Sequence, residues 1–186
     1  IYKQKKDKIT VFLLDDDQKI IKFANKRKIR LIRKNFDEFT KEIKKDQFDW
    51  LLNIWGSKIF KKNFLSKFKN NLNLHPSYLP YNRGRDPYYF SIIENTPVGV
   101  CIHRMDQSID GGKYFLKKKI KTKFPVNAGI IFDQSLYEIK KLFLKNWVKI
   151  RNNKIRLKQF SPKLKKINKI IIFKNKNFLN LDNKKN

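Results

Sequence analysis

Residues 73–84 read NLHPSYLPYNRG, and this stretch holds one of the chain's two histidines and two of its six prolines. Leu72–His75 predicts a strand, so Asn73 and His75, two residues apart, project from the same face of a sheet. Pro76 then takes the chain out of the strand, because proline lacks the N–H that the ladder needs. An amide beside an imidazole can bind a polarised carbonyl and move a proton. A histidine at a strand end can equally be a structural residue, so the pair alone leaves both interpretations open.

The rest of the chain alternates apolar, strand-like runs with helical segments. This alternation is typical of βαβ units and predicts an α/β fold with a mostly parallel sheet. Ligands bind at the carboxyl ends of such strands, where NLHPSYLPYNRG falls. We expect strands at Ile9–Leu14, Ile29–Ile32, Asp49–Trp55, Leu72–His75, Val98–Met105 and Lys113–Ile120, and helices at Ile20–Ala24 (capped by Asp15–Asp17), Phe36–Lys45, Pro87–Glu94 and Ala128–Ile150.

The last of these helices has apolar residues at steps of three and four, which predicts a stripe that packs on the core. Residues 151–186, in contrast, are basic and lack a long periodic segment. We therefore expect one domain, 1–150, followed by a basic C-terminal extension, 151–186, that covers the domain edge. The stripe consists of Phe132, Leu136, Ile139, Phe143, Trp147 and Ile150.

The chain is strongly basic, with 45 lysines and arginines against 16 acidic residues and a net charge of +29. Such a charge suits a nucleic acid, an anionic membrane surface or a phosphorylated substrate. The lysines are spread over the whole chain, however, and lysine outnumbers the arginine that phosphate clamps and base contacts favour. We therefore interpret the charge mainly as a property of composition.

Compartment and processing follow from a few absences in the sequence. The single cysteine, Cys101, excludes an intramolecular disulfide and fits a reducing compartment. The longest apolar run, 11–14, is far shorter than the roughly 20 residues of a membrane helix, and no signal peptide is visible. We therefore expect a cytoplasmic protein without membrane association. The chain starts with Ile1, so its N-terminus is either processed or incomplete.

A second loop, residues 105–112, reads MDQSIDGG and follows the strand that ends at Met105. Its two glycines let the backbone bend closely, and Asp110 can orient His75 as carboxylates do with imidazoles. Asp-Gly-Gly is also an ordinary turn sequence. His103 lies on one strand face with Cys101, and we interpret both as packing residues. Two histidines and one cysteine do not make a metal site.

In order along the chain, N-x-H-P-S-x-L-P (73–80), R-G (83–84), G-V-C-I-H (99–103), M-D (105–106) and D-G-G (110–112) resemble the formyltransferases that use 10-formyltetrahydrofolate. The resemblance extends over residues 9 to about 150. It implies a folate-dependent N-formyltransferase with a Rossmann-like, mostly parallel sheet and helices on both faces. 10-Formyltetrahydrofolate would be the cosubstrate, and no metal is implied.

The resemblance also assigns roles to residues. The family's catalytic residues fall on Asn73, His75 and Asp110. The resemblance implies that the amine attacks the formyl carbon, that Asn73 and protonated His75 stabilise the oxyanion, and that Asp110 holds His75 and helps to route the amine's proton through water. The folate would lie between the 54–56 loop and the 105–112 loop, with the cofactor-binding residues Ile54, Trp55, Gly56, Asp106 and Gly112. Pocket-shaping or substrate-binding residues would be Ser77, Arg83 and Gly84.

Three departures from the family pattern stand out. Gly111 replaces the threonine of D-T-G, which we expect to loosen the loop that carries Asp110, and Cys101 replaces a threonine in a strand. The family domain normally opens with a glycine-bearing strand and helix, so we expect the sheet to lack its first strand and helix.

Three functions fit these observations. The motifs look most similar to enzymes that formylate the amino group of a nucleotide-linked sugar, and family members often form homodimers. Methionyl-tRNA formyltransferase is the alternative, with tRNA as the partner. A non-catalytic remnant of the fold that binds a polyanion is the third.

Overall fold

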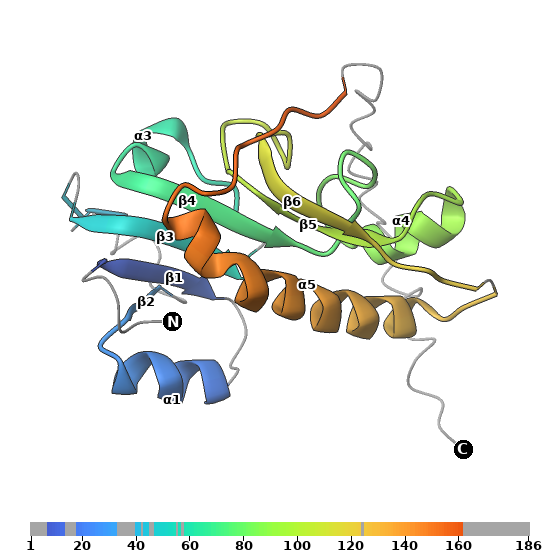
Figure 1. The fold of residues 1–186 in the computed structure, drawn as a ribbon, viewed down its shortest axis with the longest axis horizontal. Coiled ribbons are helices and arrows are strands. Elements are labelled where there is room, and N and C mark those ends of the chain that lie inside the picture. Colours follow the sequence, from blue (N-terminus) through green and yellow to red (C-terminus); the bar gives the residue numbers. More distant parts are fainter. Residues whose placement is uncertain are drawn as a thin grey trace.

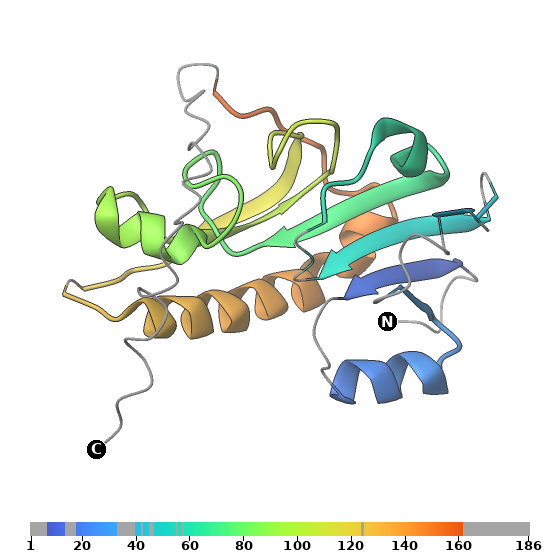
Figure 2. The same ribbon diagram turned by 180° about the vertical axis from the view of Figure 1, so that it is seen from behind.

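A computed structural model describes residues 7–13, 18–32, 40–41, 43–44, 47–54, 56, 58–123 and 125–161 (Figures 1 and 2). Its centre is a six-stranded sheet in the order β2-β1-β3-β4-β5-β6. The strands are β1 (Ile9–Leu13), β2 (Arg30–Ile32), β3 (Phe48–Ile54), β4 (Phe68–His75), β5 (Gly99–His103) and β6 (Tyr114–Lys119). The helices are α1 (Gln18–Lys26), α3 (Lys62–Leu65), α4 (Pro87–Ile93) and α5 (Ala128–Arg151).

The first four strands run in one direction, because β1 pairs in parallel with β2 and β3, and β3 pairs in parallel with β4. β5 and β6 form an antiparallel hairpin added to the β4 edge. The mostly parallel α/β sheet predicted from the sequence is therefore confirmed. The carboxyl ends of β3 and β4 meet at one edge of the sheet, which is where the fold predicts a ligand site.

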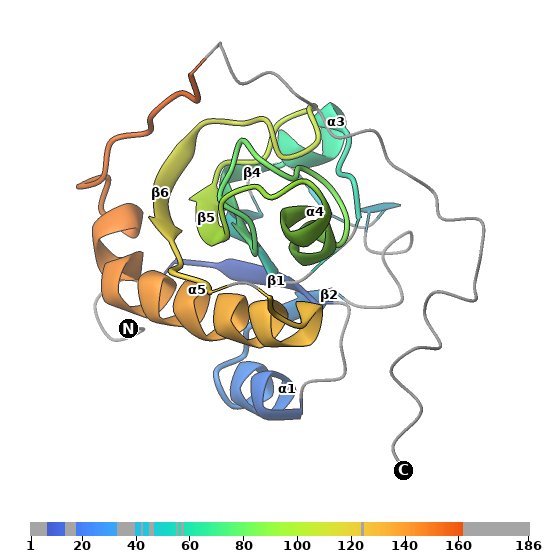
Figure 3. The same ribbon diagram turned by 90° about the vertical axis from the view of Figure 1, so that its right-hand side faces the viewer.

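Helices lie on both faces of the sheet, as expected (Figure 3). On one face, α5 packs Ile139, Trp147 and Ile150 against apolar residues of β1, β3, β4 and β5. The Trp147 ring meets the Trp50 ring edge-on at 5.1 Å. On the other face, a second cluster gathers residues of α3 around β1 and β3, namely Phe12, Ile32, Ile43, Leu51, Phe60, Phe64, Leu65 and Phe68.

Local differences from the sequence predictions have simple physical causes. β4 begins at Phe68, four residues earlier than predicted, because its first half, FKNN, carries polar residues that hide the strand. α3 has only four residues, too few to show a helical period. Most of the predicted Phe36–Lys45 helix lies outside the described residues, and so does Asp15–Asp17, the predicted cap of the Ile20–Ala24 helix.

The long helix α5 is confirmed, but its predicted stripe needs one correction. Phe132 is 37% exposed and does not pack in the core. Ile131 and Ser135 are buried beside Ile139 instead, because the core-facing side of the helix is rotated slightly in its first two turns. Phe132 lies 5.2 Å from the ring of Tyr88 on α4.

The segment after α5 returns along the outer edge of the sheet. Lys158 forms a bridge with Tyr114 of β6, and the Phe160 ring stacks on the Tyr114 ring at 4.9 Å. Ile155 and Leu157 pack against the main core. Residues 162–186 lie outside the described part, and the division of the chain at residue 150 stays a prediction.

Candidate active site

A row of three polar side chains crosses the sheet on the face opposite α5. The register pairs Asn53 of β3 with Asn73 of β4, and Asn73 with His103 of β5. Asn53 Nδ2 donates to Asn73 Oδ1 at 3.0 Å, and Asn73 Nδ2 lies 3.1 Å from His103 Nε2. All three residues are buried. Burying polar groups of this kind costs folding free energy unless they are hydrogen-bonded to one another. The row is therefore a hydrogen-bonded network that offsets the cost of its own burial.

Asp110 closes the network from the 104–113 loop. Its Oδ1 lies 3.3 Å from Asn73 Nδ2 and 3.3 Å from His103 Nε2, while its Oδ2 accepts the Gly84 N–H at 2.8 Å and lies 3.7 Å from His75 Nδ1. The backbone of Asp110 has a φ of 47°, a left-handed conformation that aspartate tolerates better than most residues. Burial raises the pKa of this carboxyl, but the two imidazoles and the Gly84 N–H outweigh burial and hold the pKa well below its usual range.

His75 ends β4 and is 5% exposed. Burial lowers its pKa; the Asp110 carboxylate opposes that shift and His103 adds to it. Nδ1 faces the Asp110 carboxylate, so the neutral ring carries its proton there and leaves a lone pair on Nε2. Among the described residues, Nε2 is a buried nitrogen without a hydrogen-bond partner. The structure thus presents an available proton acceptor backed by a carboxylate.

His103 belongs to this site, which corrects its interpretation as a packing residue. Its Nδ1 lies 3.1 Å from the Arg104 carbonyl oxygen. A carbonyl only accepts, so Nδ1 donates, and Nε2 faces Asn73 and Asp110. The two imidazole rings are 6.0 Å apart. Cys101, on the same strand, is buried with its thiol pKa raised by burial, as expected for an inert packing residue.

A pocket of about 470 Å³ opens over these side chains at the carboxyl ends of β3 and β4. Asn73, His75, His103 and Asp110 form its floor. The loops on either side supply the walls, and Phe132 adds an aromatic ring from the first turn of α5. The wall residues are Gly56, Lys58, Ile59, Phe60, Gly84, Arg85, Asp86, Pro87, Tyr88, Met105, Asp106, Ser108 and Ile109.

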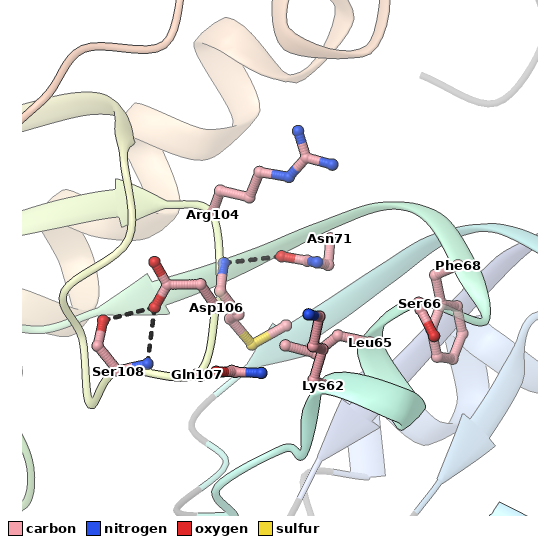
Figure 4. Close-up of a pocket in the computed structure, with 10 residues that line it drawn as sticks. Lys62, Leu65, Ser66, Phe68, Asn71, Arg104, Asp106, Gln107 and Ser108 are labelled. Atoms are coloured by element: carbon pink, nitrogen blue, oxygen red, sulfur yellow. Dashed lines mark hydrogen bonds between the residues drawn. The ribbon is translucent and has the colours of Figure 1, made fainter.

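A second pocket of about 590 Å³ adjoins the first (Figure 4). It lies between α3 and the 104–108 segment, and Met105, Asp106 and Ser108 line both pockets. Asn71 of β4 fixes the shared wall, because its Oδ1 accepts the Met105 N–H at 2.7 Å. Asp106 also accepts the Ser108 N–H at 2.8 Å, which holds the turn of the loop.

The loop that follows β4 supports the site mainly through its backbone. Ser77 is buried and donates to the Tyr81 carbonyl, so it holds the turn and does not line either pocket. Arg83 also lies away from the pockets, with its guanidinium 5.8 Å from the Phe160 ring centre. Asn82, which the sequence did not single out, anchors the loop by donating to Ser91 and Thr96 of the α4 region. Gly84 is the member of this loop that touches Asp110.

The predicted folate-binding residues fall in different places. Gly56 and Asp106 line the first pocket. Ile54 packs against the main core, and Gly112 lies so close to the Arg104 carbonyl that a Cβ would come within 2.0 Å of it. Trp55 is outside the described residues. No group of three His, Cys, Asp or Glu side chains suited to a metal ion occurs in the described part of the chain.

The space beside Gly111 is occupied by Ser108, and the expected loosening of the loop by glycine stays a prediction. A Cβ on Gly111 would lie 2.3 Å from Ser108 Oγ and 3.0 Å from Ser108 Cβ. The space that a threonine side chain would need is therefore filled by Ser108 from within the same loop.

Comparison with known proteins agrees with this geometry. The model of the Formyl transferase family matches residues 1–128. The chain belongs to the formyl transferase family. Its fold is shared with solved formyltransferases: the formyltransferase PseJ from Anoxybacillus kamchatkensis, in complex with UDP-4,6-dideoxy-4-formamido-L-AltNAc and tetrahydrofolate, aligns with a TM-score of 0.70 and 24% identity over 83% of this chain and 82% of that one.

Curated members of the family match over a shorter range. The dTDP-4-amino-4,6-dideoxyglucose formyltransferase of Mycobacterium tuberculosis is 32% identical over 81 residues, which cover 44% of this chain and 35% of that enzyme. The methionyl-tRNA formyltransferase of Borreliella afzelii is 39% identical over 77 residues, which cover 40% of this chain and 24% of that enzyme. The matches thus span about a third of these relatives or less.

Proposed function

We propose that this chain transfers a formyl group from 10-formyltetrahydrofolate to the primary amine of a nucleotide-linked amino sugar. The observation that carries the proposal is His75 Nε2. This nitrogen is buried, lines the pocket, is unpartnered among the described residues, and has Asp110 behind its ring and Asn73 beside it. Proton acceptor, carboxylate and amide donor are the groups that amine acylation needs in one place.

His75 moves the proton. An amine that attacks a carbonyl carbon must lose a proton as the C–N bond forms, and neutral Nε2 can accept it. The resulting imidazolium is stabilised by the Asp110 carboxylate 3.7 Å from Nδ1. His75 therefore becomes the charged residue beside the developing oxyanion, the role that the sequence motif implies, after it has acted as the base. When the intermediate collapses, the bond between the formyl carbon and the folate nitrogen breaks, and the His75 imidazolium returns the proton to that nitrogen, which leaves as tetrahydrofolate.

Asn73 supplies the neutral donor. Its Oδ1 is occupied by Asn53, so Nδ2 and its two hydrogens face Asp110 and His103 at the pocket floor. A carbonyl oxygen that gains negative charge in the pocket competes for these hydrogens. A preorganised donor of this kind contributes about 10²–10³ to the rate in other acyl-transfer sites.

The two adjoining pockets suit an elongated, partly aromatic cosubstrate such as a folate, which supplies the formyl carbon. Phe60, Met105 and Leu65 give apolar walls, while Asp106 and Asn71 offer polar atoms. Of the motif-derived contacts, Gly56 and Asp106 lie where they can touch such a ligand. Ile54 and Gly112 would act as supports of the two loops, and a folate contact of Trp55 stays a prediction.

The outer rim of the first pocket favours a nucleotide-linked acceptor. Tyr88 and Phe132 form a pair of aromatic rings there, and Lys58 and Arg85 add positive charge. Aromatic faces stack on bases, and cations attract a diphosphate. By their names, the mycobacterial relative acts on a nucleotide-linked sugar and the structural neighbour binds one, which supports the same acceptor class.

Methionyl-tRNA is the second candidate acceptor, favoured by the net charge of +29 and by the relative from Borreliella afzelii. A tRNA partner predicts binding that weakens steeply with salt.

We also propose a cytoplasmic location, since the described Cys101 is a free thiol. A homodimer stays a prediction. None of the helices in the described ranges is long and apolar enough to cross a bilayer.

A panel assay separates these candidates. The purified chain is incubated with 10-formyltetrahydrofolate and, in turn, nucleotide-linked amino sugars, free amino sugars and methionyl-tRNA, and tetrahydrofolate release is followed. We expect release with a nucleotide-linked amino sugar and not with its free sugar. Release with methionyl-tRNA alone would replace the proposed acceptor. No release with any amine, together with salt-sensitive polyanion binding, would favour the non-catalytic remnant.

A further inference from the structure

Asn53 is a buried polar residue in the otherwise apolar end of β3, and the formyl-transfer motifs do not include it. It is 3% exposed. Its Nδ2 donates both to the Gly56 carbonyl oxygen at 3.1 Å and to Asn73 Oδ1 at 3.0 Å. A leucine of similar shape would fill this position at a lower desolvation cost, so packing does not explain an amide here.

The hydrogen bonds that link Gly56, Asn53 and Asn73 form a series in which each bond fixes the orientation of the next amide. The Gly56 carbonyl can only accept, so it orients the Asn53 amide with its nitrogen toward Gly56 and Asn73. Asn73 must then turn its oxygen toward Asn53. As a result the Asn73 nitrogen points toward Asp110 and His103, at 3.3 and 3.1 Å.

The opposite orientation of Asn73 has almost the same shape but the opposite chemistry. Rotation of the amide by half a turn would place Oδ1 against the Asp110 carboxylate and would present an acceptor, not a donor, to the pocket floor. Asp110 opposes that rotation from one side and Asn53 from the other. The amide is thus held from two sides, by Asn53 in register on the adjacent strand and by Asp110 from the loop.

From this geometry we infer that Asn53 is a positioning residue, which sets the amide of Asn73 so that its donor faces the reacting carbonyl. The inference rests on the proposed formyl transfer and deepens it. Gly56 takes part through its backbone: a Cβ at this position would lie 2.1 Å from Asn53 Oδ1. Glycine at this position is therefore required by the side chain of Asn53, and the ring of Phe12, 2.4 Å from the same Cβ, adds to the requirement.

The test reverses the polarity of the bond. In Asn53→Asp, an ionised carboxylate accepts from Asn73 and turns its nitrogen away from the pocket, whereas Asn53→Leu only removes the bond and leaves Asp110 to hold Asn73. We expect kcat to fall about 100-fold in Asn53→Asp and about tenfold in Asn53→Leu, with the KM of both substrates within about threefold of wild type. Asn70→Asp, on the opposite face of β4, is the charge control.

A pH comparison distinguishes positioning from a general loss of structure. Burial raises the pKa of a carboxyl at position 53, so lowering the pH from about 8.5 to about 6.5 protonates it. The protonated carboxyl donates to Asn73 again, and the activity of Asn53→Asp relative to wild type recovers. Equal losses in the Asp and Leu variants at both pH values, or an unchanged kcat in Asn53→Leu, would overturn the inference.

The two histidines give a readout that does not depend on activity. Both lie in the site, so each ring gives one resolved set of signals in an NMR spectrum of the full chain. In Asn53→Asp we expect the ring-nitrogen signals of His103 to shift, because its Nε2 then faces the oxygen of Asn73. Unmoved His103 signals in a folded Asn53→Asp protein would refute the orientation chain even if the protein transfers no formyl group. If the wild-type protein transfers no formyl group but the His103 signals shift in Asn53→Asp, the proposed function is refuted and the orientation of Asn73 by Asn53 stands.

Discussion

Replacing Asp110 with asparagine tests the electrostatic core of the site. Asparagine has the same shape, tolerates the left-handed backbone at this position and can still accept the Gly84 N–H. The change removes the negative charge that faces two imidazole rings and replaces the acceptor oxygen that faces Asn73 and His103 with an NH2 group. We expect the folded structure to persist and the chemical step to slow.

The size of the effect follows from one distance. A full charge pair at the 3.7 Å between His75 Nδ1 and Asp110 Oδ2 is worth about 4 kcal/mol at an effective dielectric constant of about 20. This attraction exists only once His75 has taken the amine proton, so it lowers the barrier and not the energy of the resting site. The asparagine dipole replaces part of it, so we expect kcat to fall about 10²- to 10³-fold.

The assay is the rate of tetrahydrofolate release at saturating substrates, with circular dichroism to confirm the fold. KM should stay within about threefold of wild type, because the charge acts on the transition state. Asp133→Asn, on the exposed side of α5, is the matched control and should retain full activity. A folded Asp110→Asn protein with less than a tenfold loss of kcat would show that the pairing with His75 is not part of the mechanism.

Three further predictions concern stability. Gly111→Thr should lower the free energy of unfolding by about 1–3 kcal/mol, since its Cβ meets Ser108, and adding Ser108→Gly should restore most of it in urea titrations. Trp147→Ala should cost about 3–5 kcal/mol, because it empties a site in the main core; a loss below about 1 kcal/mol in the same titration would contradict the packing described. The stability should be constant between pH of about 6.5 and about 8 and fall below that range, because burial lowers the pKa of His75 and the unfolded chain then binds the extra proton. His75→Gln should reduce that slope, and an unchanged slope would assign it to other groups.

Much of the fold was predictable because its strands are short, apolar runs bounded by turn residues. Ile9–Leu13, Gly99–His103 and the long helix α5 all follow from local pattern. The pattern failed where composition hides it: β4 begins in a Lys–Asn segment, and α3 is a single turn. The exposure of Phe132 could not be predicted either, because Ile131 and Phe132 are both apolar and the packing of α5 decides which of them is buried.

The candidate site was predicted in part. Asn73 and His75 lie two residues apart on one strand, and Asp110 precedes a pair of glycines in a turn. The local sequence was therefore enough to identify all three as candidate site residues. Asn53 and His103 were missed because only the register of three strands brings them beside Asn73. A single polar residue inside the apolar run WLLNIW was the available signal for Asn53, since such a residue must find a partner when buried.

The most direct test of the account is single-turnover formyl transfer by wild type and His75→Ala with a nucleotide-linked amino sugar. The account predicts tetrahydrofolate release by wild type, a loss of about 10²–10⁴ in His75→Ala, and partial recovery when free imidazole is added to that variant. Transfer by His75→Ala at the wild-type rate would contradict it.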